Sequence, residues 1–307
     1  MTTTNGPAPV TTETVDSRFA DVDRLPTLAL ASLINQEDAT VAEAVGERLE
    51  PISATVDAVV ARLRRGGRLI YAGAGTAGRL GVLDASECPP TFNTDPELVV
   101  GLIAGGPDAL VTAVEGAEDD LSLARTDLED LGVGPDDAVI GISASGRTPY
   151  AVEAVTAARE AGAFTAGISC NADTALSAAA EVPIEVVVGP EVVAGSTRLK
   201  AGTAQKLVLN MISTMTMVRL GKTYGNLMVD VRASNTKLVA RVHRIVADAT
   251  GADEATVDRA VHESGGRAKT AILAIIAGLD PTTADAELAA DDGVLRTTLT
   301  RLTGTKE

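Results

Sequence analysis

The sequence has no tryptophan, and aromatic residues make up only 2% of its 307 positions. Hydrophobic residues nevertheless account for 45% of the chain. The buried core must therefore be built mainly from valine, isoleucine, leucine and alanine. Such a composition favours helices packed on a parallel sheet, because the buried strands of such sheets read as runs of aliphatic residues.

Histidine and cysteine are scarce as well, since the chain contains only His243, His262, Cys88 and Cys170. Two cysteines cannot form a framework of several disulfides or a four-cysteine zinc site, and they favour a reducing compartment. Two imidazoles are too few for a histidine-rich metal site, and they nearly exclude a Ser-His-Asp hydrolase. We therefore expect no metal site and a cytoplasmic location.

Positive charge is in short supply, because 26 lysines and arginines face 42 aspartates and glutamates, for a formal net charge of −16. A surface this acidic repels nucleic acids and anionic membranes. No run of about 18 uncharged apolar residues is present, which argues against a membrane-spanning helix. An anionic substrate would also be repelled. Any phosphate site must therefore be local and built from backbone N–H groups and hydroxyls.

The N-terminal residues 1–16 are rich in threonine, proline, asparagine and glycine, and we expect them to be disordered. They contain no basic residues followed by an apolar run, so they do not match the pattern of a signal peptide.

Aliphatic segments then alternate with segments of helical periodicity. Strands are expected at residues 68–72, 98–104, 138–142, 164–169 and 182–188, with the last one weakened by Pro183. Helices are expected at about residues 51–63, 109–131, 149–161 and 198–220. This alternation predicts an α/β fold, namely a three-layer, doubly wound domain around a parallel five-stranded sheet.

The last part of the chain is helical throughout, and its helices are split at Gly251, at Gly265 and Gly266, and at Gly278. We interpret it as a small C-terminal helical domain. The expected division is a disordered N-terminus over residues 1–16, the α/β domain with N-terminal helices over residues 17–235, and the helical domain over residues 236–307.

The first candidate motif is a glycine-rich turn at residues 73–78, Gly-Ala-Gly-Thr-Ala-Gly, which follows a strand and opens a helix. It matches the dinucleotide-binding fingerprint, but that site also needs an acid at the end of the next strand. Here Glu97 stands at the start of that strand and Asp108 lies beyond the following turn. An NAD enzyme is therefore disfavoured. The turn can still bring a phosphate or sugar close to backbone N–H groups, with Gly75 and Thr76 as candidate contacts, unless it is a plain tight turn.

The second motif, Ser143-Ala-Ser145-Gly146-Arg147-Thr148, also lies between a strand and a helix. Its three hydroxyls at a helix N-terminus can form an anion site that needs no lysine. Such a site suits a protein in which positive charge is scarce. One of the hydroxyls could simply cap the helix, but three exceed what a cap needs. The two loops together favour a phosphosugar site over a dinucleotide site.

Acidic residues are expected near the same rim of the sheet. Glu87 stands near the end of a helix, where the dipole disfavours negative charge, and Pro89 and Pro90 should stop that helix. Glu115 and Glu118 are three residues apart and could share a helix face. A solvated acidic surface is the alternative interpretation for Glu87 and Glu118.

A polar loop over residues 189–206 follows the last expected strand and enters a long helix. Its position again indicates the carboxyl edge of the sheet. Glu191, Ser196, Thr197 and Lys200 are the candidate substrate contacts in it. Routine capping of the helix by Ser196 or Thr197 is the alternative.

Long stretches of the chain resemble the N-acetylmuramic acid 6-phosphate etherase family, whose main domain has the sugar isomerase (SIS) fold. The stretches that carry this resemblance are GRLIYAGAGTAGRLGVLDASECPPTF, GLIAGG, VEGAEDD, GISASGRTPY, GISCN, VAGSTRLKAGTAQKLVLNMIST and GNLMVDVRASNTKL. Together they cover nearly the whole chain. The family usually has Thr-Ser after the first glycine turn, whereas this chain has Thr76-Ala77, so one hydroxyl near the substrate is missing.

The resemblance implies a lyase that converts N-acetylmuramic acid 6-phosphate into N-acetylglucosamine 6-phosphate and D-lactate, in the recycling of cell-wall amino sugars. It implies elimination followed by hydration, with no cofactor. Glu118 would remove the C2 proton, and Glu87 would act as the acid and base for the ether oxygen and water. Two carboxyl groups in different protonation states are needed for this chemistry. The resemblance also implies a homodimer, to which the apolar, Met-rich stretch Val208–Val218 would contribute.

Three alternatives stay open from the residues alone. A non-catalytic sugar-phosphate regulator, such as the glucokinase regulatory protein of the same fold, would not need both glutamates, and a DNA-binding regulator would carry a basic N-terminal helix-turn-helix. A sugar-phosphate isomerase of the same fold would also need an acid/base pair, so a product assay would be required to separate it. An NAD enzyme would be revealed by titration with the cofactor.

Overall fold

The computed structural model describes residues 10–231 and 236–304 of the chain. The chain forms two compact units. The α/β unit holds the chain up to Ser86 and Pro96–Ser213, and the helical unit holds Glu87–Asp95 and the chain from Thr214 onward. The division between the two units falls inside a long helix. The domain boundary after residue 235 stays a prediction.

The α/β unit contains a five-stranded parallel sheet, as predicted. Its strands are β1 (Leu69–Gly73), β2 (Val99–Ile103), β3 (Ala138–Ile142), β4 (Phe164–Ser169) and β5 (Val182–Glu185), in the order β2-β1-β3-β4-β5. The chain passes from β1 outward to β2 and then returns to the other side of β1 for β3. Gly73 at the end of β1 lies level with Ile103 of β2 and Ile142 of β3. The loops that follow β1 and β3 therefore emerge next to each other.

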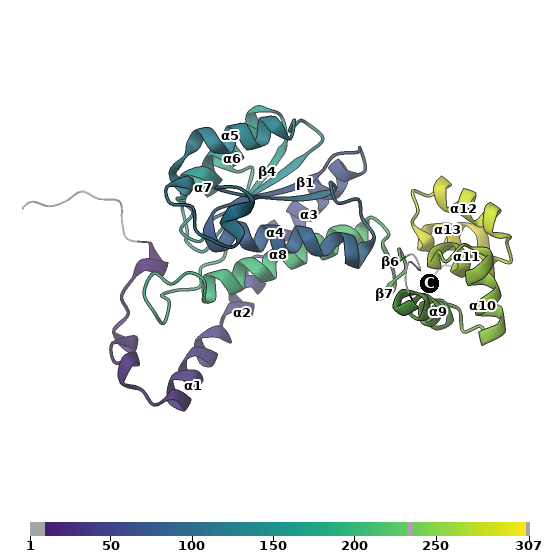
Figure 1. Cartoon of the computed structure of the whole chain (residues 1–307), viewed down its shortest axis with the longest axis horizontal. Helices are drawn as coiled ribbons and strands as arrows, with labels where there is room; N and C mark the ends of the chain where they lie inside the picture. The colour runs from purple at the N-terminus through teal and green to yellow at the C-terminus, as the bar shows by residue number, and fades with distance from the viewer. Residues whose placement is uncertain (1–9, 232–235, 305–307) are drawn as a thin grey trace, which may run out of the picture. The chain divides into compact units, whose positions relative to one another are not determined.

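Helices cover both faces of this sheet (Figure 1). One face carries α3 (Leu49–Leu63), α4 (Gly75–Phe92) and α8 (Lys200–Arg219), and the other carries α5 (Leu121–Asp130), α6 (Pro149–Glu160) and α7 (Ala175–Ala179). The helix predicted at residues 51–63 buries the expected face: Ile52, Val56, Val59, Val60 and Leu63. On the opposite face Ile70 and Val139 of the sheet pack with the fully buried Tyr150 of α6. The core is thus mainly aliphatic, as the composition requires.

The prediction of one helix over residues 109–131 is wrong for the first half of that range. Residues 107–110 and 117–119 form two short 3-10 turns, η4 (Pro107–Leu110) and η5 (Ala117–Asp119), and only α5 is a regular helix. Gly116 has a left-handed φ of 75°, which interrupts a helix, and the Asp120 carboxylate caps α5 by accepting from the N–H groups of Ser122 and Leu123. Glu115 and Glu118 therefore do not share a helix face.

The expectation that Pro89 and Pro90 stop their helix is also wrong, because α4 continues to Phe92. Each proline removes one helical N–H and with it one i→i−4 hydrogen bond, yet the helix continues past both of them. The N–H of Asn93 still donates to the Pro89 carbonyl at 2.9 Å, and Asn93 then ends the helix with a φ of 51°.

The segment that precedes the core helices is partly docked onto the α/β unit. It contains η1 (Thr11–Glu13), η2 (Ser17–Phe19), η3 (Val22–Arg24), α1 (Thr27–Asp38) and α2 (Val41–Gly46). Thr12 is fully buried, its carbonyl accepts the Gly195 N–H at 3.1 Å, and its hydroxyl accepts from Asn171 Nδ2 at 3.2 Å. Described structure therefore begins within the range 1–16 that was expected to be disordered.

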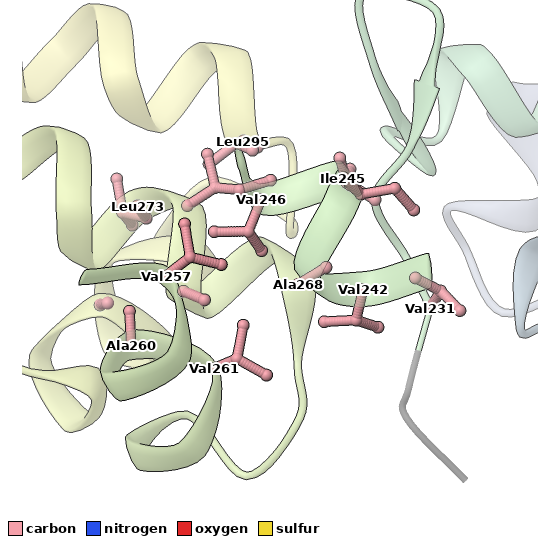
Figure 2. Packing of buried hydrophobic residues seen from close by; sticks show 14 of the residues in the cluster. Val231, Val242, Ile245, Val246, Val257, Ala260, Val261, Ala268, Leu273 and Leu295 are labelled. Atoms are coloured by element: carbon pink, nitrogen blue, oxygen red, sulfur yellow. The ribbon is translucent and has the colours of Figure 1, made fainter. Parts of the chain in front are cut away.

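Besides the ends of α4 and α8, the described residues of the helical unit form a two-stranded hairpin and five helices. These elements are β6 (Thr223–Tyr224), β7 (Leu227–Met228), α9 (Thr236–Thr250), α10 (Glu254–Glu263), α11 (Ala268–Ala277), α12 (Pro281–Ala290) and α13 (Leu295–Thr303). The helices break at the predicted glycines. Figure 2 shows Val246, Leu273 and Leu295 converging in one aliphatic cluster, and all three are fully buried. None of the described helices is long and apolar enough to span a bilayer.

Candidate functional site

A cavity of about 200 Å³ lies where the loops after β1 and β3 meet. We call it the hydroxyl cavity. Its lining consists of Glu13, Ala74, Gly75, Thr76, Ala77, Glu118, Ser143, Ala144, Ser145, Thr148, Thr197 and Gln205. All of these residues belong to the α/β unit. The position follows the rule that ligands bind at the carboxyl edge of a parallel sheet, at the point where the strand order reverses.

The first glycine turn brings the start of α4 against the end of β1. Gly75 has a left-handed φ of 52°, which favours glycine. A Cβ on Gly78 would lie 2.6 Å from the Gly73 carbonyl oxygen, so only glycine allows helix and strand to approach this closely. As a result, the first turn of α4 and Thr76 form one wall of the cavity. The buried Ala77 also lines this wall, at the position where a serine hydroxyl was expected.

The second loop gathers three hydroxyls around Ser143, which is buried. Ser143 Oγ lies 2.8 Å from Thr148 Oγ1 and 3.3 Å from Ser145 Oγ, and it accepts the Gly146 N–H at 3.0 Å. Ser145 and Thr148 are only half-buried and line the cavity. Ser143 thus holds the loop together, and all three hydroxyl residues line the cavity.

Thr148 occupies the N-cap position of α6 without capping it. Its side chain makes no capping hydrogen bond, and Pro149 follows at the first helical position. The N–H groups in the first turn of α6 are therefore not taken by a capping side chain. Together with the hydroxyls they form the kind of anion site that a helix N-terminus provides.

Glu118 lies in η5 and lines the hydroxyl cavity. The neighbouring Ala117 is buried against the core and anchors this turn, whereas the Glu118 side chain is exposed. Glu118 also lines a second cavity of about 180 Å³, which we call the Arg79 cavity. The remaining lining of the Arg79 cavity is Ala74, Gly75, Arg79, Ala104, Ala109, Ala113, Val114, Glu115, Gly116 and Ala117. Glu118 therefore stands where two adjoining cavities meet.

Not all of the candidate contacts predicted in the loop at residues 189–206 line the hydroxyl cavity. Thr197 lines the hydroxyl cavity, whereas Ser196 is half-buried outside its lining. Glu191 is almost fully buried, and its carboxylate accepts the backbone N–H groups of Lys200 and Ala201 at 3.0 Å each. It thereby holds the start of α8.

Lys200 has its ammonium group committed to an ion pair. Its Nζ lies 2.8 Å from Glu37 Oε2, and only 3% of its side chain is exposed. Neither Lys200 nor Glu191 lines either cavity. The structure thus brings Gly75, Thr76, Ser143, Ser145, Thr148, Thr197 and Glu118 together, while Glu191 and Lys200 stabilise the frame around them. Gly146 supports the loop, because its φ of 65° is left-handed and a Cβ would lie 2.4 Å from Thr174.

Glu87 is exposed on the C-terminal half of α4 and belongs to the helical unit. It lines neither cavity. The role that the family resemblance implies for Glu87 therefore stays a prediction.

Two further polar residues line the hydroxyl cavity that sequence reasoning did not select. Gln205 is 1% exposed, and its Nε2 has no hydrogen-bond partner in the described part of the chain. The sequence pattern could have revealed Gln205 as a candidate. It lies among the buried Ala201, Ala204 and Val208 on the apolar face of α8, where an amide side chain is unexpected. Glu13 was missed because it stands in a segment with no regular periodicity.

The buried Cys170 can be excluded as a nucleophile. Burial, and secondarily the charge of Glu191, raise the pKa of its thiol to about 12. The thiol is therefore protonated and unreactive near neutral pH.

Two known domain families match parts of the chain. Residues 51–159 match the family described as the glucokinase regulatory protein N-terminal SIS domain, and residues 122–215 match the SIS domain family. The phosphoheptose isomerase from Francisella tularensis is 16% identical, with a TM-score of 0.51 over 63% of this chain and 100% of that chain, which shows a shared fold.

Closer relatives match over almost their full length. The N-acetylmuramic acid 6-phosphate etherase of Streptomyces avermitilis is 64% identical over 94% of this chain and 93% of that protein. The etherase of the same name from Mycolicibacterium smegmatis is 55% identical over 94% of this chain and 97% of that protein. Identity at this level extends through both compact units. The chain therefore belongs to the N-acetylmuramic acid 6-phosphate etherase family.

Proposed function

We propose that the protein cleaves the D-lactyl ether of N-acetylmuramic acid 6-phosphate and releases D-lactate and N-acetylglucosamine 6-phosphate. The observation that carries this proposal is the position of Glu118. Its exposed carboxylate lies between a hydroxyl-lined anion cavity and a second cavity. A sugar phosphate held in the first cavity would thus have a base beside its ring and space for its ether substituent.

Binding of the phosphate comes first in this mechanism. The hydroxyls of Ser145 and Thr148 and the first-turn N–H groups of α6 donate to the phosphate oxygens. None of these donors carries a charge, so the site works within an acidic protein. Thr76 and Thr197 line the same cavity and can bind sugar hydroxyls.

The chemical step is an elimination followed by an addition of water. Opening of the sugar ring gives an aldehyde at C1, which acidifies the proton on C2. The Glu118 carboxylate takes that proton, the C2–H electron pair becomes the C2=C3 bond, and the C3–O bond breaks. The departing lactyl oxygen takes a proton from an acid. Water then adds its oxygen to C3, and C2 regains a proton.

The division of acid and base roles is a further part of the proposal and comes from the family resemblance. Glu118 is assigned the C2 proton, and Glu87 is assigned the proton for the ether oxygen and the activation of water. Proton removal precedes departure of the lactyl group, so loss of the later acid leaves the earlier step possible.

Hydrogen exchange in heavy water tests this division. We expect Glu118→Gln to abolish both D-lactate release and exchange of the C2 hydrogen, a loss of about 10²–10⁴-fold. Glu87→Gln should block lactate release and still permit some exchange. Exchange that survives only in the Glu118 variant would reverse the roles. Normal lactate release in both variants, or a ketose phosphate formed by the wild type without lactate, would overturn the proposed reaction.

We also propose that the protein acts as a cytoplasmic homodimer. Two observations support this: the scarcity of cysteine, and the face of α8 on which Met211 and Met215 are only partly buried and Val218 is 47% exposed. Light scattering should then give twice the chain mass of 31.3 kDa. A mass equal to a single chain at working concentration would refute the dimer.

A further inference from the structure

Arg79 is a cation with unused hydrogen-bonding capacity beside the candidate site. It lies near the start of α4, is half-buried, and lines the Arg79 cavity. Its Nε donates to the Leu110 carbonyl at 3.0 Å. Within the described ranges, its two terminal nitrogens make no hydrogen bond or ion pair, even though Glu115 and Glu118 line the same cavity. In a protein of net charge −16, such a guanidinium is an unusual feature.

The two cavities adjoin each other. They share Ala74, Gly75 and Glu118 in their linings. A sugar phosphate with its phosphate at Ser145 and Thr148 would have its C2–H beside Glu118. The substituent on C3 would then extend into the Arg79 cavity.

The chemistry of that cavity suits one group in particular. Part of its wall is formed by small apolar side chains, namely Ala74, Ala104, Ala109, Ala113, Val114 and Ala117. Arg79 is the single cation among the described residues that line the two cavities. Lys200 is not available, because it is paired with Glu37. A lactyl group carries one methyl and one carboxylate, which match the apolar wall and the guanidinium.

We propose that Arg79 binds the carboxylate of the lactyl ether and thereby selects the substrate by its leaving group. This inference rests on the proposed function, since the carboxylate belongs to the substrate named there. A guanidinium can hold a carboxylate through two parallel N–H···O bonds, which fixes orientation as well as position. Held in this way, the C3–O bond stays aligned beside Glu118 during elimination.

The test compares two substrates and three variants. The substrates are N-acetylmuramic acid 6-phosphate and its analogue in which the lactyl carboxylate is a neutral amide. Arg79→Gln should lower kcat/KM for the natural substrate by roughly 10–100-fold, as expected for the loss of a charge-assisted hydrogen bond. On the amide analogue, kcat/KM of the Arg79→Gln variant should differ from that of the wild type by less than about threefold. Arg79→Lys keeps the charge but not the fork, and should recover only part of the loss.

Arg159→Gln is a matched control. Arg159 also donates to a backbone carbonyl, that of Ala179 at 3.2 Å, and it lines neither cavity. It should leave kinetics on both substrates unchanged. Inhibition by free D-lactate is a second readout, and Arg79→Gln should weaken it by a similar factor.

The outcomes separate the two proposals. If the wild type releases no D-lactate, the proposed function fails and this inference falls with it. If the wild type is active and Arg79→Gln keeps full activity, the Arg79 proposal alone is overturned. An equal loss on both substrates would also overturn it, because the residue would then act only through its bond to the Leu110 carbonyl.

Discussion

The hydroxyl cavity and the aliphatic cluster of the helical unit are built on opposite principles. The cavity gathers polar groups: Gln205 Nε2, which has no hydrogen-bond partner in the described part of the chain, and the hydroxyls of the half-buried Ser145 and Thr148. In the aliphatic cluster of Figure 2, Val246, Leu273 and Leu295 are fully buried. The polar groups of the hydroxyl cavity are suited to binding a ligand, at a cost in stability. The buried aliphatic side chains of the helical unit stabilise the fold. Substitutions in the two regions should therefore affect different measurements.

The largest effect is expected in the aliphatic cluster. Leu273→Ala should lower the free energy of unfolding by about 2–5 kcal/mol, because it leaves a cavity at a fully buried site. Leu273 lines neither cavity and has no part in the proposed reaction, so KM and kcat per folded molecule should not change. Denaturant unfolding and steady-state kinetics would measure this. A change in KM at a temperature where the variant is folded would break the comparison.

A pH-dependent effect on stability is expected at Asp137, which stands directly before β3. Burial alone would raise its pKa, but hydrogen bonds from the Arg68 side chain and from backbone N–H groups outweigh burial and lower it. Because the folded-state pKa is lowered, this stabilisation is present above pH ~4 and is lost as the pH falls through the folded-state pKa.

Asp137→Asn should thus cost roughly 1–3 kcal/mol of stability at pH 7. Below pH ~4 the difference from the wild type should shrink. Thermal unfolding at several pH values measures it. A difference that stays constant down to acidic pH would argue against an ionised Asp137.

Within the hydroxyl cavity, Ser145→Ala should weaken substrate binding by roughly 1–3 kcal/mol if its hydroxyl donates to a phosphate oxygen. The side chain is half-buried, so the melting temperature should stay close to that of the wild type. KM and kcat both unchanged would remove Ser145 from the phosphate site.

Gln205→Leu sharpens the comparison further, because it should separate stability from binding. The substitution removes a buried donor that has no partner in the described structure. We expect stability to be kept or to rise by up to about 1 kcal/mol, while substrate binding weakens. A loss of stability together with normal kinetics would mean that Gln205 is structural.

The smallest effect is expected at Ala77, which lines the hydroxyl cavity. Ala77→Ser adds the hydroxyl that the family resemblance leads one to expect. Because Thr76, Ser145 and Thr148 already supply hydroxyls there, kcat/KM should change by less than about threefold. A gain of tenfold or more would indicate that this chain lacks an important contact.

Much of the α/β fold could be predicted because its signals are local. The five strands are aliphatic runs, and β3 and β4 begin and end where the runs do. The segment from Ala109 to Asp120 was misread because its composition suits a helix, while Gly116 and the capping Asp120 decide otherwise. Pro89 and Pro90 were misread as well, because proline was expected to stop α4 and the helix continues past both to Phe92.

One part of the candidate site could likewise be predicted from the sequence, and another part could not. The motifs after β1 and β3 could be located from the chain, because strand ends in a parallel sheet lie at one edge. Whether a polar side chain from the loop at 189–206 faces the cavity or the frame depends on which partner lies nearest in space. Thr197 lines the cavity, whereas Lys200 finds Glu37 from a distant segment and Glu191 caps α8. No local pattern encodes that choice.

The amino-acid sequence by itself determined the class of the fold and the family, and it predicted a phosphate site built without lysine. Composition and period control how strands and helices form, and runs of matching residues identify relatives. Only the tertiary structure placed Glu118 between two cavities and brought Arg79 to the wall of the second cavity. It also left Gln205 Nε2 without a hydrogen-bond partner among the residues that the structure describes. These arrangements depend on contacts between segments far apart in the chain, where burial and hydrogen-bond competition decide which side chains remain free to act.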